Sequence, residues 1–146
     1  LVLKTIKIVH LCVVLRNGKL PYDNMDNLLS LSREGDMTSS LKGIVDNLSM
    51  TYDGNMLASV SDSAPAPSVT GSADFRDGAS EAVEYTYDRN GNMTSDLNRK
   101  VSLISYNRQN RPARMRHAGG TETFTYLPDG TKRGRTVLGK DRSSAG

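Results

Sequence analysis

Few residues in this sequence have both the type and the spacing that a reaction centre needs. The run DRNGN at 88–92 has the Asp-x-Asn-x-Asn order that opens a calcium-binding loop. Such a loop needs glycine at its sixth position and glutamate at its twelfth. Those positions hold Met93 and Arg99. The run therefore predicts a tight turn, and we expect no metal site in the chain.

Nucleophilic catalysis has no better support. His10 and His117 are the two histidines, and neither lies in a motif with a serine or cysteine nucleophile. Cys12, the one cysteine, lies in an apolar run, which is typical of a buried small hydrophobe rather than a reactive thiol. The sequence also has no glycine-rich phosphate-binding loop. We expect a protein that is not an enzyme, with no catalytic residue and no cofactor.

Acidic side chains follow tyrosines directly at Asp23, Asp53 and Asp88. A general acid or base acts at one place in a protein. A carboxylate that returns with every copy of a motif instead indicates hydrogen bonding within turns.

A basic cluster is the remaining candidate for binding chemistry. Arg108, Arg111, Arg114 and Arg116 follow Tyr106, and arginines beside an aromatic ring can bind phosphate and stack a base. Residues 99–146 hold 11 Lys and Arg against 3 Asp and Glu, whereas residues 1–98 hold 8 against 13. Three interpretations stay open: a solvated strand face, a site for an acidic glycan, and nucleic-acid binding. Nucleic acid is the least favoured, because one aromatic ring is a thin stacking platform.

The elements that position these residues come from a repeat. Aligned on tyrosine, five copies start at Tyr22, Tyr52, Tyr87, Tyr106 and Tyr126. Their spacings are 30, 35, 19 and 20 residues. The last two spacings indicate a repeat architecture with a period near 20, and we interpret the first two as the same unit with an insertion.

Each copy predicts a strand, a tight turn and a second strand. Residues before the tyrosine are β-prone with period-2 alternation, as in 84–87 and 123–126. Residues after it tolerate the positive φ that hairpin turns require. The residues of this structural motif are Tyr22, Asp23, Tyr52, Asp53, Gly54, Asn55, Tyr87, Asp88, Gly91, Asn92, Met93, Tyr106, Asn107, Tyr126, Asp129 and Gly130.

These motifs resemble the YD-repeat, or Rhs-repeat, family of bacterial proteins. The family repeat runs roughly Tyr-Asp-x-x-Gly-Asn-Leu/Met and often continues with Tyr-Asn-x-x-Asn/Gly-Arg/Leu. The first half matches YTYDRNGNMT at 85–94 and the second half matches ISYNRQNRPARM at 104–115. The resemblance covers about 19–137 and is weakest at 22–33, where Met25 and Asp26 stand in place of the glycine turn.

The resemblance implies a fold and a role. YD-repeat arrays form a continuous β-ribbon that spirals into a hollow shell, and the shell can enclose a toxic C-terminal polypeptide used in competition between bacteria. Related arrays take part in adhesion at cell surfaces. The apolar content of 36%, with two Phe and no Trp, suits a one-layer ribbon, which needs less core than a packed globule.

The expected fold is therefore all-β: an antiparallel YD-repeat hairpin ribbon, a fragment of the array that precedes the Rhs repeat-associated core region. YD-type repeats are expected at 19–60 and 83–138, with a Pro/Ser/Gly-rich loop at 61–82. Residues 139–146 are expected to be a disordered tail. Residues 1–18 are read as an aberrant start, a strand of the fold or a weak targeting segment, too often interrupted by charge for a membrane span.

The first function hypothesis is a non-enzymatic structural segment of a secreted or cell-surface Rhs-type protein. Its partners would be flanking repeats or a C-terminal toxin of the same polypeptide. The alternative is a surface adhesion or glycan-binding β-module that uses the basic half at 99–137.

Overall fold

The computed structural model describes residues 12–14, 20–69 and 74–139. All secondary structure in this part of the chain is β, as the sequence predicts, and no membrane-spanning helix is found in it. The chain divides into two compact units, Leu1–Ala82 and Val83–Gly146. The expected start segment lies outside the described residues except for Cys12–Val14. The expected disordered tail at 139–146 lies outside them except for Gly139, which belongs to a strand.

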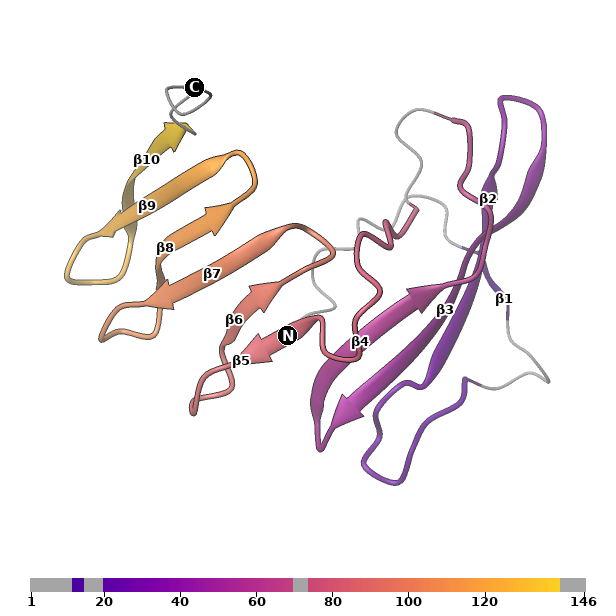
Figure 1. The fold of residues 1–146 in the computed structure, drawn as a ribbon, viewed down its shortest axis with the longest axis horizontal. Coiled ribbons are helices and arrows are strands. Elements are labelled where there is room, and N and C mark those ends of the chain that lie inside the picture. Colours follow the sequence, from indigo (N-terminus) through magenta and orange to yellow (C-terminus); the bar gives the residue numbers. More distant parts are fainter. Residues whose placement is uncertain (1–11, 15–19, 70–73, 140–146) are drawn as a thin grey trace, which may run out of the picture. The chain divides into compact units, whose positions relative to one another are not determined.

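The first unit contains one antiparallel sheet of four strands, in which neighbours in the sequence are neighbours in the sheet (Figure 1). The strands are β1 (Cys12–Val14), β2 (Ser30–Asp36), β3 (Lys42–Asp53) and β4 (Met56–Asp62). Turn residues of the repeat, Gly54 and Asn55, connect β3 to β4, and a second short connection at 37–41 joins β2 to β3.

The described core of the first unit is small and partly polar. Val45, Leu48 and Val60 are the buried apolar side chains among the described residues of this unit. Arg33 and Asp46 lie opposite each other on β2 and β3, and both are buried as an ion pair. A buried pair of this kind is tolerated where further hydrogen bonds satisfy it, and the Phe75 amide donates to Asp46 Oδ1 at 2.6 Å.

The described residues between β4 and β5, 63–69 and 74–84, contain no strand, and most of them belong to the segment expected to be a loop. Hydrogen bonds join this segment to the first sheet and its connection. Besides the Phe75 contact, Ser68 N donates to the carbonyl of Met37 at 2.9 Å. Asp62 N donates to Asp77 Oδ2 at 3.0 Å. The segment therefore covers part of the first sheet.

The second unit contains one antiparallel sheet of six strands, again a meander (Figure 1). The strands are β5 (Tyr85–Tyr87), β6 (Met93–Asp96), β7 (Val101–Tyr106), β8 (Pro112–His117), β9 (Gly120–Tyr126) and β10 (Lys132–Gly139). β5 and β10 are the two ends of the sheet order.

In the second unit, as far as Gly139, the buried apolar side chains are Tyr85 and Val101, and buried polar groups accompany them. Asn98 Nδ2 donates to Glu84 Oε2 at 2.8 Å and to the Tyr85 hydroxyl at 3.1 Å. Burial raises the pKa of Tyr85. These bonds satisfy polar groups that would be costly to bury alone.

Gly120 allows β9 and β10 to approach closely. Its φ is +140°, and a Cβ placed there would lie 2.1 Å from the carbonyl oxygen of Leu138. Since that oxygen belongs to the backbone, no side-chain movement relieves the clash, and only glycine fits at this position.

Candidate functional site

The Asp or Asn that follows the repeat tyrosine shapes the turn. In the turn at 88–92, Asp88 Oδ1 accepts bonds from the amides of Asn90 and Asn92, both at 2.9 Å. Asp88 N donates to the Asn92 carbonyl at 2.8 Å, and Gly91 N donates to the Asp88 carbonyl at 3.0 Å. The side chain thus caps the backbone groups that a five-residue turn leaves without a strand partner.

The turn at 23–27 repeats this pattern without a glycine. Asp23 Oδ1 accepts from Met25 N and Asn27 N at 2.8 and 2.9 Å. Asp26 takes the left-handed conformation with φ +62°, where Gly91 has φ +76°. The copy that looked weakest in sequence therefore has the same backbone, because Asp and Asn tolerate this region.

An asparagine replaces the aspartate in the turn at 107–111. Asn107 Oδ1 accepts from Gln109 N at 2.9 Å and from Arg111 N at 3.0 Å, and Asn110 is left-handed with φ +59°. A neutral amide oxygen therefore suffices for this turn.

Two copies depart from the pattern. Between β3 and β4 the loop has two residues, since Asp53 pairs with Met56 and Gly54 has φ +60°; glycine first in a two-residue loop is typical of a type II′ turn. In the turn at 127–131 the accepting side chain belongs to the third residue, Asp129, whose Oδ1 accepts a bond from Thr131 N at 2.8 Å. Gly130 is left-handed there, with φ +84°.

The turn carboxylates are held in their charged form. Asn27 Nδ2 donates to Asp23 Oδ2, and Asn92 Nδ2 donates to Asp88 Oδ2, both at 2.9 Å. These side-chain bonds, followed by the backbone bonds, lower the pKa of Asp23 and of Asp88. The backbone amide of Thr131 lowers the pKa of Asp129.

The repeat tyrosines join successive hairpins. The hydroxyl of Tyr52 donates to the carbonyl of Leu28 at 2.9 Å. The Tyr106 hydroxyl donates to Met93 O at 2.7 Å, and the Tyr126 hydroxyl donates to Pro112 O at 2.7 Å. In each case the acceptor is the sixth residue after the preceding repeat tyrosine.

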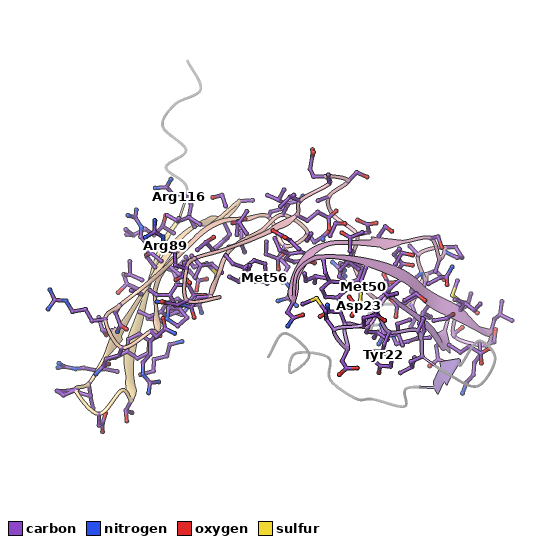
Figure 2. The ribbon with its side chains drawn as sticks, turned by 90° about the horizontal axis from the view of Figure 1, so that it is seen from below. Tyr22, Asp23, Met50, Met56, Arg89 and Arg116 are labelled. Carbon is purple, nitrogen blue, oxygen red and sulfur yellow. The ribbon has the colours of Figure 1, made fainter. Side chains whose placement is uncertain are left out.

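Burial accompanies these hydroxyl bonds. It raises the pKa of Tyr52 and of Tyr106, and the charges of Asp23 and Asp88 raise them further. In the first unit Met50 N donates to the Leu29 carbonyl at 2.8 Å, which places Met50 beside the turn that Tyr22 and Asp23 begin (Figure 2). The Tyr52 hydroxyl lies 3.6 Å from the Met50 sulfur.

Side-chain amides link neighbouring turns. Asn27 Nδ2 donates to the Gly54 carbonyl at 3.0 Å. Asn92 and Asn110 exchange two bonds, at 2.6 and 3.1 Å. Gln109 Nε2 donates to the Pro128 carbonyl at 2.8 Å. The turns of each unit therefore form a hydrogen-bonded edge.

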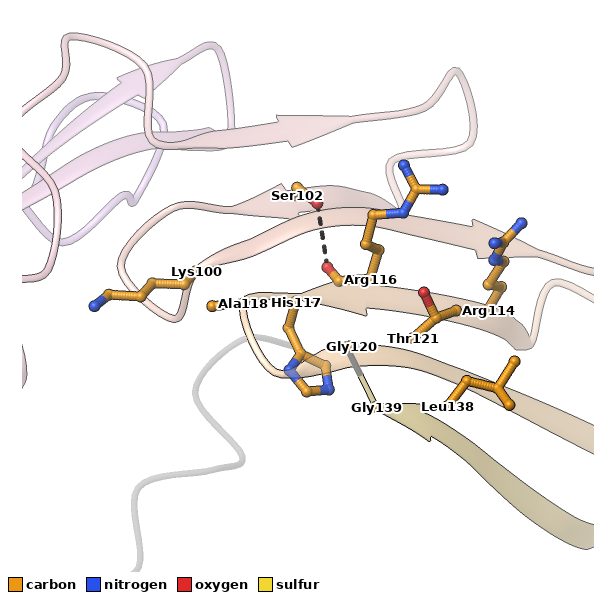
Figure 3. Close-up of a pocket in the computed structure, with 10 residues that line it drawn as sticks. All are labelled: Lys100, Ser102, Arg114, Arg116, His117, Ala118, Gly120, Thr121, Leu138 and Gly139. Atoms are coloured by element: carbon orange, nitrogen blue, oxygen red, sulfur yellow. Dashed lines mark hydrogen bonds between the residues drawn. The ribbon is translucent and has the colours of Figure 1, made fainter. Parts of the chain in front are cut away.

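The four arginines of the predicted ligand face do not form one group. Arg108 is exposed in its turn, and the Arg111 guanidinium lies 5.8 Å from the centroid of the Tyr126 ring. Arg114 and Arg116 share one side of β8, and the His117 ring lies on the other (Figure 3).

Arg114 and Arg116 line a hollow of about 470 Å³ together with Lys100, Ser102, Thr121 and Leu138. No carboxylate lines it, while Ser102 and Thr121 add hydroxyls. The nearby Glu122 accepts a bond from Arg135 Nε at 2.8 Å, and this contact lowers the pKa of Glu122. The hollow suits an anionic group.

Three carboxylates of the first unit come together although they lie far apart in the sequence. One oxygen each from Asp46, Asp62 and Asp74 lies within 4.8 Å of the others. Burial raises the pKa of Asp74, and the negative charges of Asp46 and Asp62 raise it further. This is the group of described carboxylates best placed to share a cation, but the Arg33 guanidinium already occupies Asp46.

Comparisons with protein-family models, with curated proteins and with solved structures returned no match to this chain.

Proposed function

We propose that this chain is a non-enzymatic structural segment of a secreted or cell-surface protein of the YD-repeat type. Its hairpins form part of a β-ribbon that curves into a shell, and the shell encloses or presents a C-terminal toxin. The observation that carries the proposal is the tyrosine hydroxyl bond, which recurs at three hairpin junctions with the same six-residue offset.

Two further features support a structural role. The polar residues that recur with the motif are engaged in turns and between turns. The described residues include few buried apolar side chains, so we expect lateral bonding between hairpins to contribute more of the stability than it does in a packed globule.

The coding DNA on both sides of this segment tests the proposal. We expect further in-frame copies of the Tyr-Asp-x-x-Gly-Asn motif upstream, and a core region followed by a toxin-sized domain downstream. Stop codons in frame on both sides, in intact genomic DNA, would contradict it.

A second candidate function is the binding of an acidic glycan at a surface. The hollow lined in part by Lys100, Arg114 and Arg116 favours it, because three basic residues and no carboxylate line it. A sulfate or carboxylate of a sugar chain would match this charge and the neighbouring hydroxyls.

A further inference from the structure

The hydroxyl bonds between hairpins follow one counting rule. Leu28, Met93 and Pro112 each stand six residues after a repeat tyrosine and each accept the hydroxyl of the next one. The rule holds for a turn that begins with Asp and for one that begins with Asn. It therefore belongs to the backbone geometry of the hairpin rather than to one side chain.

Counted from Tyr126, the last repeat tyrosine, the same rule reaches the edge of a sheet. Six residues after Tyr126 stands Lys132, the first residue of β10, and β10 ends the strand order of its sheet. No tyrosine follows Tyr126 in the sequence. Val137 is 52% exposed and Leu138 63% exposed. The described part of this edge thus has an acceptor position and apolar side chains but no neighbouring hairpin.

We propose that the β10 edge binds the first strand of another tyrosine-repeat hairpin, whose tyrosine hydroxyl is donated to the carbonyl of Lys132. The incoming strand runs antiparallel to β10, as β9 runs to β8. The inference rests on the proposed function, since it treats the chain as part of a repeat array, and it repeats the β8–β9 interface, which lies two strands earlier in the sheet.

The last turn adds a requirement on the partner. At the preceding junctions a side-chain amide joins the two turns, as Gln109 does to Pro128. The turn at 127–131, with sequence LPDGT, has no amide side chain. It presents the carboxylate of Asp129, so the incoming turn has to supply the donor, such as an asparagine.

Charge points to an acidic incoming strand. β10 carries Lys132, Arg133 and Arg135, all exposed, and Arg135 is paired with Glu122. Lysine and arginine on an edge strand are also a known means of preventing strand pairing. An edge protected in that way would bind no hairpin.

The probe is a synthetic peptide with the sequence of residues 83–97, VEYTYDRNGNMTSDL. It contains a strand that ends in Tyr87, a turn with Asn90 and Asn92, and three acidic residues against one arginine. The matched control is the same peptide with Tyr87→Phe, which keeps the ring and removes only the hydroxyl. Hydrogen–deuterium exchange of the full chain locates the contact, and calorimetric titration compares the two affinities.

We expect slower amide exchange at residues 132–139 with the unaltered peptide, and binding weaker by roughly threefold to tenfold for the phenylalanine peptide, the effect of losing one neutral hydrogen bond. Unchanged exchange at 132–139, or equal affinity of both peptides, would overturn the proposal. If flanking repeats are found in the coding DNA and the peptide still fails to bind, the structural function stands and only the assignment of the β10 edge fails.

Discussion

At the scale of single residues, the hydroxyl of the repeat tyrosine is the group that distinguishes this sheet from an ordinary meander. A strand is normally joined to its neighbour by backbone bonds alone. Here the tyrosine just before one turn also donates its hydroxyl to a carbonyl just after the previous turn. The ring supplies apolar area beside the turn, and its polar end removes the cost of covering that carbonyl.

The change Tyr52→Phe tests this bond in the first unit. We expect it to lower the free energy of unfolding by about 1 kcal/mol, because the Leu28 carbonyl loses its donor in a partly buried place. Tyr22→Phe is the control, since its side chain is 52% exposed and surface changes usually stay within about 0.5 kcal/mol. Urea unfolding followed by circular dichroism measures both. Equal losses in the two variants would contradict the role given to the hydroxyl.

The turn carboxylates predict how stability depends on acid. The pKa of Asp88 is lower in the folded chain than its usual value of 3.8. Its contribution is therefore complete above the unfolded pKa and is lost as the pH falls through the folded one. We expect the urea midpoint to fall on acidification below about pH 4.

Asp88→Asn isolates this effect from Asp23 and Asp129, which titrate in the same range. The amide oxygen keeps the backbone bonds of the turn, as Asn107 does in the next repeat. The variant should be less stable than the parent at pH 7, because Asn92 loses an acceptor, and should lose less on acidification. A difference between the two proteins that stays constant from pH 7 to pH 3 would count against the charged form as the source.

At the scale of the hairpin, glycine serves two separate purposes: a left-handed backbone in a turn and a close approach of two strands. Substitution by alanine at one position of each kind distinguishes them. Gly91 has φ +76° and open space where a Cβ would point, whereas Gly120 has a carbonyl 2.1 Å from that point. Gly91→Ala should cost about 1 kcal/mol for the left-handed backbone, and Gly120→Ala should cost clearly more because β9 and β10 have to separate. Thermal unfolding ranks the two variants, and a Gly120→Ala protein as stable as Gly91→Ala would disprove the close approach.

Gly91→Asn should be milder than Gly91→Ala. Asn110 and Asp26 hold the same left-handed conformation in their own turns, and their short polar side chains can bond locally. The same thermal series measures it, and a larger loss for asparagine than for alanine would show that these turns are not equivalent.

How far the sequence predicts the structure also differs from element to element. Period-2 alternation at 84–87 and 123–126 identifies strands β5 and β9, and glycine identifies the turns at Gly91 and Gly130. The turn at 23–27 looks irregular in the sequence because Asp26, and not glycine, adopts the left-handed conformation there. The Arg33–Asp46 pair was not foreseen, because it depends on a register that a bulge after Arg33 changes.

The basic cluster shows the same limit. The sequence gathers four arginines within nine residues, but the pleat of β8 and the turn before it divide them. Arg111 lies over Tyr126, while Arg114 and Arg116 line the hollow with Lys100, a residue that the sequence did not single out. Only the strand alternation of Arg114 and Arg116 was available as a signal.

At the scale of the whole molecule, the charge asymmetry gives the glycan hypothesis a test. We expect Arg114→Ser with Arg116→Ser to weaken binding to a sulfated glycan by about tenfold or more, because both guanidinium groups of the hollow are lost. Arg89→Ser with Arg108→Ser removes the same charge from two exposed turns and is the control.

Titration at two salt concentrations measures the effect, because exposed charges are screened by salt. If both double variants lost the same affinity for the glycan, binding would depend on the net charge of the protein and not on the hollow. Binding of the parent that persists unchanged in high salt would count against a charge-driven site.

The six-residue offset between a tyrosine and its acceptor carbonyl also determines where such a chain can grow. One added residue in the turn at 107–111 would move Pro112 away from the Tyr126 hydroxyl and turn the faces of the following strand over. Connections at the other ends of the strands carry no such constraint. The extra length between Tyr52 and Tyr87 is found there, after β4, whereas the extra length between Tyr22 and Tyr52 lies mainly in the longer strands β2 and β3. We therefore expect an epitope tag or an inserted domain to be tolerated in the connections away from the tyrosines and to disrupt the fold in the turns that follow them. The connections at one edge of a sheet can vary in length, whereas the turns at the other edge cannot.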